Sequence, residues 1–225
     1  MSRATARACY LFRMPSSRMP AAPLTVQAHP WHGVSPGARA PEVVTCYVEM
    51  VPTDTVKYEV DKASGILRLD RPQLYSSQPP CLYGFIPRTY CDVRVGARCA
   101  RRLGRTGIVG DGDPIDVCVL TEKPISHGAI LVEAVPIGGL RMIDGSEADD
   151  KIVAILKDDA AYGAWRDVAD VPASLIDRLR HYFLTYKALP DAPNPPVEIA
   201  EVYDAAEARA TIEESFEDYR AKFGG

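Results

Sequence analysis

The chain has 225 residues, of which 47% are apolar, and its 26 basic and 30 acidic residues give a net charge of −4. This composition supports a folded core and excludes both a polybasic nucleic-acid binder and an acidic disordered chain. No apolar run approaches the roughly 20 residues of a membrane span, because charges, Gly or Pro interrupt each one. The six cysteines form no CxxC pair, which favours reduced thiols in a cytoplasmic compartment over a disulfide framework.

Residues 1–40 differ in composition from the rest of the chain. They are rich in Ala, Pro and Ser, contain arginines but no Asp, Glu or Lys, and show no sustained period. We therefore predict an N-terminal tail over 1–40, disordered or partly ordered as a strap around His29–His32, and one folded domain over 41–225. An organellar transit peptide is the alternative for this tail, although its prolines would break the amphipathic helix of such a peptide.

The sequence after the tail predicts short strands followed by helices. β-Branched and apolar residues recur in six runs separated by Gly, Pro and Asp, and every connection is too short for a crossover helix. These runs are 43–50, 56–60, 66–69, 115–120, 130–135 and 152–156. Apolar residues at helical spacing follow over 172–186 and after Asp204, where Glu207 three residues on is typical of a helix start. Strands first and helices last predict an α+β fold, with helices packed on an antiparallel sheet or small barrel.

The most informative segment is Gly110–Asp116, where three carboxylates fall between a glycine turn and an apolar strand. A solvated turn is the plainest explanation of such a segment taken alone. A calcium loop of the EF-hand type is excluded in practice, because Ile115 stands where that loop needs an oxygen ligand and Asp116 where it needs glycine.

A second acidic group contains Asp144, Glu147, Asp149 and Asp150 and ends at Lys151, directly before a predicted strand. It reads either as a charged hairpin loop or as the partner of the first acidic segment at one end of a barrel. In the second case the carboxylates would repel one another unless cations lay between them, and hard oxygen ligands suit Mg²⁺ or Mn²⁺.

Basic and phenolic residues are interleaved with these acids. They are Lys57, Arg71, Lys151, Tyr186 and Lys187. Carboxylates that hold divalent metals, together with cations that hold oxyanions, are typical of a phosphoryl-transfer site, and no P-loop motif is present.

The order and spacing of these residues match one known family along residues 43 to 220. The matching motifs are Asp111–Val117, Glu49, Lys57–Lys62, Ser64-Gly65, Asp70-Arg71, Tyr83–Pro87, Asp144, Asp149–Lys151 and Tyr186-Lys187. On these motifs the chain resembles the soluble family I inorganic pyrophosphatases. The resemblance implies an OB-like, five-stranded β-barrel flanked by C-terminal helices, Mg²⁺-dependent hydrolysis of pyrophosphate in the cytoplasm, and a homo-oligomer.

The resemblance also assigns roles to individual residues. It implies that Asp111, Asp116 and Asp149 bind the first Mg²⁺, that Asp116 is shared with a second, and that Asp144 and Asp149 bind metals arriving with substrate. Mn²⁺ or another divalent ion is an alternative. Asp113 resembles the general base that deprotonates the attacking water. Two further groups follow from the family pattern: Glu49 and Glu59 line the cavity, and Lys57, Arg71, Tyr83, Lys151, Tyr186 and Lys187 bind pyrophosphate.

Two features depart from the family pattern. Pro79 stands near the place of a second tyrosine, which puts one phosphate or metal-water contact in question. Residues 88–105 form an insert with six arginines and one acid, predicted as a solvated flap or hairpin at the mouth of the site, in which Cys91 and Cys99 are close enough in sequence to pair. The alternative function is a non-catalytic pyrophosphatase-like scaffold that binds protein or nucleic acid through this insert.

Overall fold

The computed structural model describes residues 27–187, 189 and 197–224. Its centre is a ring of five strands: β1 (Val44–Met50), β4 (Leu82–Phe85), β6 (Asp116–Leu120), β9 (Lys151–Leu156) and β7 (Ile130–Asp144). Each strand pairs with the next in this order, and β7 pairs with β1, which closes the ring. All the pairings are antiparallel except β6 with β9. The ring is the structural counterpart of the small barrel that the sequence implied.

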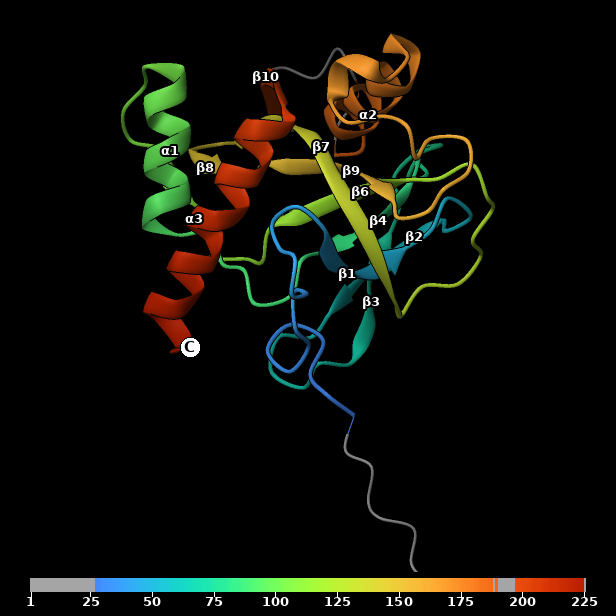
Figure 1. Cartoon of the computed structure of the whole chain (residues 1–225), viewed down its shortest axis with the longest axis horizontal. Helices are drawn as coiled ribbons and strands as arrows, with labels where there is room; N and C mark the ends of the chain where they lie inside the picture. The colour runs from blue at the N-terminus through green and yellow to red at the C-terminus, as the bar shows by residue number, and fades with distance from the viewer. Residues whose placement is uncertain (1–26, 188, 190–196, 225) are drawn as a thin grey trace, which may run out of the picture.

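Shorter strands and the helices surround the ring (Figure 1). Strand β10 (Val197–Asp204) extends the sheet along the second half of β7, β8 (Glu147–Ala148) pairs with the end of β7, and β5 (Val109–Gly110) pairs with β8. A separate hairpin joins β2 (Val56–Val60) to β3 (Leu67–Pro72). Helix α1 (Val93–Leu103) lies beside α3 (Ala205–Phe223), whereas α2 (Ala173–Thr185) covers another side of the strands.

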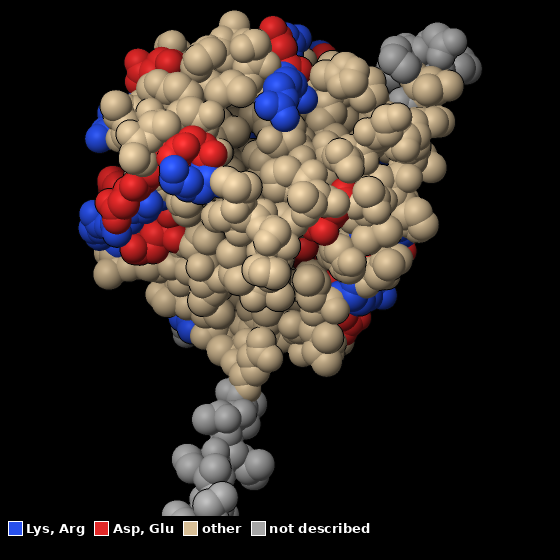
Figure 2. All heavy atoms as spheres, turned by 90° about the vertical axis from the view of Figure 1, so that its right-hand side faces the viewer, with Lys and Arg blue, Asp and Glu red and all other residues tan. Residues whose placement is uncertain are grey.

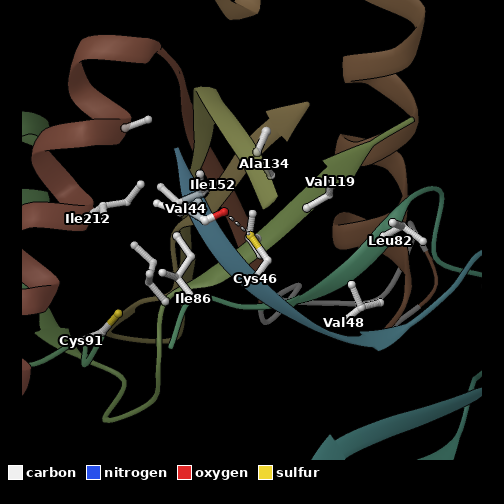
Figure 3. Close-up of a cluster of buried hydrophobic side chains, with 14 of the residues drawn as sticks. Val44, Cys46, Val48, Leu82, Ile86, Cys91, Val119, Ala134, Ile152 and Ile212 are labelled. Carbon is white, nitrogen blue, oxygen red and sulfur yellow. Dashed lines mark hydrogen bonds between the residues drawn. The ribbon is translucent and has the colours of Figure 1, made fainter. Parts of the chain in front are cut away.

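The core consists of two main apolar clusters, which are separated because successive side chains along a strand point to opposite faces. Figure 3 shows the first of them, which contains Val44 and Ile152. Val117 and Val119 of β6 join the cluster that also contains Val44 of β1 and Ile212 of α3. The intervening Cys118 joins the cluster under α2. Because β6 and β9 are buried on both faces, their sequences are continuous apolar runs and not alternating ones.

Both C-terminal helices were predicted, and the second begins as expected. The Asp204 carboxylate accepts a hydrogen bond from the Glu207 N–H at 2.8 Å, which satisfies one free donor of the first turn of α3. Within the described residues, no helix is both long enough and apolar enough to cross a membrane.

One sequence prediction was wrong. The 88–105 insert contains helix α1 and is not a hairpin or flap, so the connection after β4 does hold a helix. Cys91 and Cys99 are buried free thiols in different clusters and do not pair. Trp31 is 5% exposed and packs among aromatic side chains, so the strap expected around His29–His32 is ordered, on the N-terminal side of the domain boundary predicted near Pro41.

Candidate active site

One cavity at the side of the ring gathers residues from eight separate parts of the chain. Every site residue predicted from the sequence lines this cavity. These residues are Glu49, Lys57, Glu59, Arg71, Tyr83, Asp111, Asp113, Asp116, Asp144, Asp149, Lys151, Tyr186 and Lys187. The hairpin β2–β3 supplies one wall, the loop before β6 and the turn after β7 supply the acids, and the C-terminal end of α2 supplies the last two residues.

The loop before β6 is held by backbone hydrogen bonds that leave its carboxylates pointing into the cavity. Gly112, in the left-handed region at a φ of 75°, donates its N–H to the Cys91 carbonyl at 2.9 Å, and the Asp113 carbonyl accepts from the Cys91 N–H at 2.8 Å. The Asp111 carboxylate accepts the Asp113 N–H at 3.0 Å. Glycine at the turn therefore allows two acids to lie one residue on either side of a tight bend.

Strand register places the first acidic group next to the second. Asp116 at the start of β6 is directly opposite Lys151 at the start of β9. The ammonium of Lys151, a side chain 2% exposed, contacts the carboxylates of both Asp116 and Asp149. The Tyr83 hydroxyl also donates to Asp116, at 2.5 Å. The parallel pairing of these two strands thus brings the two acidic segments to one place.

The remaining predicted cations also contact acids, either in the cavity lining or, for Asp70, beside it. Lys187 contacts the Asp144 carboxylate. Lys57 lies 3.6 Å from Glu59 and 3.4 Å from Asp70, and the Arg71 guanidinium donates to Asp70 at 2.6 Å. Acidic and basic side chains are therefore paired with one another in and around the cavity.

Burial disfavours the charged forms of the acids. Burial and the neighbouring Asp149 carboxylate raise the pKa of Asp111 to about 9. Burial, with smaller contributions from Asp116 and Glu59, raises the pKa of Glu49 to about 8. Burial likewise raises the pKa of Asp116, against the opposing effect of Lys151. A group of acids in this state is stabilised by added positive charge.

The donor set fits a hard divalent cation in its chemistry, because its members are carboxylates that face a common space. In the described part of the chain no three carboxylates, imidazoles or thiols converge on one point. The ammonium groups of Lys151 and Lys187 lie against Asp116, Asp149 and Asp144 and so already provide part of the positive charge.

Sequence reasoning gave no role to several other residues of the cavity. Lys62, from the turn between β2 and β3, contacts the Asp113 carboxylate. Trp31 and Phe183 line the cavity from the N-terminal residues and from α2. Two features of the sequence could have pointed to these residues. Trp31 is an isolated tryptophan in an otherwise Arg/Ala/Pro-rich segment, and Lys62 belongs to the Lys57–Lys62 motif. Pro79 lies outside, in a hollow beside α2.

The arginines of the insert do not reach the cavity. Arg98 donates to Glu207 at 2.6 Å and to Glu214 at 3.0 Å, and Arg105 donates to Glu198 at 2.8 Å. Arg94 pairs with Asp218, Arg101 pairs with Glu214, and Arg102 pairs with both Glu201 and Glu207. On the face seen in Figure 2, too, acidic and basic side chains lie intermingled. The insert therefore offers no broad basic surface for a nucleic acid.

Comparison with solved structures shows which class of protein has this fold. The chain superposes on the crystal structure of inorganic pyrophosphatase from Thermus thermophilus with a TM-score of 0.71 and 29% identity, over 86% of this chain and 99% of the other. Type I inorganic pyrophosphatase from Toxoplasma gondii gives a TM-score of 0.69 and 26% identity, over 87% and 88%. The five-stranded ring is thus the OB-like fold of these enzymes.

The sequence comparisons agree and reach higher identity. Inorganic pyrophosphatase of Chlamydia muridarum is 48% identical over 88% of this chain and 96% of its own length. Soluble inorganic pyrophosphatase of Oryza sativa is 39% identical over 87% and 81%. A family model described as inorganic pyrophosphatase matches residues 46–220. The chain belongs to the inorganic pyrophosphatase family.

Proposed function

We propose that this chain hydrolyses inorganic pyrophosphate to two orthophosphates and that Mg²⁺ is the metal it uses. The observation that supports this function best is the gathering of all thirteen family-type residues, from distant parts of the sequence, on one cavity. Hydrolysis of a polyanion requires both acids for metal and cations for phosphate, and the cavity holds both.

Each group of side chains has a part in the proposed reaction. Asp111, Asp116, Asp144 and Asp149 would hold the divalent ions, which neutralise substrate oxygens and lower the pKa of a bound water. Asp113 accepts the proton of the attacking water. The phosphate oxygens are bound by Lys57, Arg71, Tyr83, Lys151, Tyr186 and Lys187, while Glu49 and Glu59 complete the wall.

The buried ammonium of Lys151 illustrates how this lining suits the reaction. It lies within a low-dielectric wall, where a fixed positive charge stabilises a developing oxyanion more than it would in water. Its two carboxylate partners, Asp116 and Asp149, hold it in place in the cavity wall.

The direct test is release of phosphate from pyrophosphate by the full chain. We expect turnover with Mg²⁺, none after chelation by EDTA, and recovery when Mg²⁺ is added back. Mn²⁺ in place of Mg²⁺ tests the choice of metal. Absence of phosphate release with every divalent ion would favour the scaffold alternative. The pairing of α1 arginines with acids argues against that alternative.

We also propose that the protein acts in the cytoplasm and assembles as a homo-oligomer. All the described cysteines are free thiols, which suits a reducing compartment. Light scattering coupled to size exclusion would measure the assembly. An active monomer at assay concentration would contradict this part of the proposal.

A further inference from the structure

The N-terminal strap, defined here as residues 29–33, packs between the cavity and the C-terminal helix. The Trp31 indole N–H donates to the Thr89 carbonyl at 2.8 Å, and the Arg88 N–H donates to the Trp31 carbonyl at 2.9 Å. His32 Nδ1 lies 2.7 Å from the Tyr219 hydroxyl. Trp31 is buried, yet it lines the cavity. The strap is therefore attached to the body of the protein on both sides.

His29 joins this strap to the turn that carries Lys62. Its Nδ1 accepts the Trp31 N–H at 3.1 Å, and its Nε2 lies 3.2 Å from the Lys62 carbonyl oxygen. One neutral tautomer, with the proton on Nε2, satisfies both contacts. Packing is equally close, because a Cβ added to Gly65 would lie 2.8 Å from the His29 ring. Gly65 also has a φ of +73°, which other residues rarely adopt.

The turn itself is ordered without help from the strap. The Asp61 carboxylate accepts the Ser64 N–H at 2.9 Å and the Ser64 hydroxyl at 2.7 Å, and the Asp61 carbonyl accepts the Gly65 N–H at 2.8 Å. These bonds fix the shape of the turn. Its position relative to the cavity depends on contacts with the rest of the protein, which include His29 at the Lys62 carbonyl and the Val60 N–H, which donates to the Glu49 carboxylate at 2.6 Å. Position and shape thus have separate determinants.

The loop of Asp113, the acid that Lys62 contacts, is also connected to Trp31. Thr89, whose carbonyl receives the Trp31 indole, is fully buried, and its hydroxyl accepts the Ile115 N–H at 2.9 Å. Ile115 lies two residues after Asp113 in the acidic loop. Trp31 is therefore linked through His29 to Lys62, and through Thr89 to the loop of Asp113.

We infer that Lys62 is a further positioning residue of the reaction proposed above, holding the Asp113 carboxylate in its working orientation, and that the N-terminal strap holds Lys62 in place. This inference rests on the proposed function. The Lys62 ammonium contacts Asp113, the acid proposed as base, and both side chains are partly exposed, at 51% and 38%. An exposed ion pair contributes little to the free energy of unfolding, so we assign this pair a role in orienting the Asp113 carboxylate for the reaction.

The test compares Lys62→Met, which keeps length and removes charge, with Lys62→Arg, which keeps charge. We expect Lys62→Met to lower kcat about 5- to 20-fold with KM for pyrophosphate within about two-fold, and Lys62→Arg to recover most of the loss. Lys123→Met is the matched control, because Lys123 is exposed and its ion-pair partner among the described residues is its neighbour Glu122. It should leave kcat and KM unchanged.

The role of the strap is tested by His29→Ala and by the double variant with Lys62→Met. We expect His29→Ala to lower kcat as well, and the double variant to be no worse than Lys62→Met, because both changes act on one contact. His127→Ala, at an exposed position in the loop before β7, is the control. In a Trp165→Phe background, we expect Lys62→Met to leave the fluorescence of Trp31 unchanged. This measurement reports on the packing of the strap and does not depend on catalytic turnover.

Several outcomes would overturn the inference. Unchanged kcat in Lys62→Met would remove the positioning role, and a higher KM at constant kcat would make Lys62 a substrate-binding cation. Equal losses in Lys62→Arg and Lys62→Met would exclude charge as the cause. Additive losses in the double variant would separate the strap from Lys62. If the unaltered chain releases no phosphate, it is the proposed function that fails.

Discussion

At the scale of single residues, the site depends on acids and cations that are each other's partners. Lys151 contacts two carboxylates, Lys187 contacts Asp144 and Lys62 contacts Asp113. Removing one member therefore changes the charge balance of its neighbours as well as its own contact. Variants that preserve shape are the most informative, because they separate proton transfer and metal binding from packing.

Asp113→Asn is such a variant. The amide fills the same space but accepts no proton, so we expect kcat to fall about 10²- to 10⁴-fold while the fold is retained. Phosphate release and a thermal unfolding curve, measured on the same preparation, check this prediction. Turnover near that of the unaltered chain would rule out Asp113 as the base.

Asp116→Ala and Asp144→Ala should differ in Mg²⁺ affinity. Asp116 is the proposed shared ligand and is also bonded to Tyr83 and Lys151, whereas Asp144 is in contact with Lys187 at the edge of the group. We expect the larger loss of affinity in Asp116→Ala, measured by calorimetric titration of Mg²⁺. Equal affinities, or a larger loss at Asp144, would contradict the shared role.

The sequence predicted the charged and phenolic residues of the cavity well, but it did not predict the residues that hold them in position. The thirteen side chains lie in short linear motifs whose order is visible in the sequence, and all of them line the cavity. The contact of Lys62 with Asp113, or of His29 with Lys62, joins segments that only the tertiary fold brings together. A linear pattern carries no signal for such contacts.

At the scale of secondary structure elements, α1 is the instructive case. Its sequence has six positions occupied by Arg, Gly or Cys, and its buried side is only Val95, Gly96 and Cys99. The helix is stabilised by arginine pairs with acids of α3 and β10, in addition to this narrow apolar stripe. Strands β4 and β10 were missed because β4 has only four residues and β10 alternates acids with apolar residues directly before a helix.

Arg98→Ala tests the structural role of α1. Arg98 is 18% exposed and bridges Glu207 and Glu214, so its loss leaves a mostly buried carboxylate without one partner. We expect the free energy of unfolding to fall by about 1–3 kcal/mol with kcat/KM unchanged. Arg101→Ala, 65% exposed, is the control and should change stability by less than about 0.5 kcal/mol.

Urea unfolding and salt-dependent kinetics distinguish this role from electrostatic capture of substrate. If α1 attracted pyrophosphate, Arg98→Ala and Arg101→Ala would both raise KM at low ionic strength, and added salt would remove the effect. That result would show that the arginines of α1 contribute to substrate capture as well as to stability.

At the scale of the whole molecule, the N-terminal segment contributes to the core as well as to the surface. Trp31 packs with Tyr47, Phe85 and Tyr219, which come from three distant parts of the chain. Its contacts join the beginning of the described chain to its last helix. The domain thus includes residues that composition alone assigned to the tail.

Two shortened chains separate the strap from what precedes it. A chain that begins at Ala28 keeps every contact of Trp31, and we expect its activity and melting temperature to match those of the full chain. A chain that begins at Val34 loses Trp31, and we expect it to be less stable by about 3–5 kcal/mol, as for loss of a buried tryptophan. Equal stability of the two would place the start of the domain near Pro41.

The length of β7 has a consequence for the order in which the molecule assembles. Its fifteen residues pair with β1, β9, β8 and β10, and the ring closes only when Val44 of β1 meets Ala134 of β7. Until β7 has been synthesised, β1 has one exposed hydrogen-bonding edge, and until β10 follows, half of β7 has another. Such long-range pairings are slow to form and leave strand edges open to other chains meanwhile. A nascent or heat-unfolded chain is therefore most prone to aggregate through the open edges of β1 and β7. Because β7 takes part in closing both edges, refolding depends on the pairing of this strand.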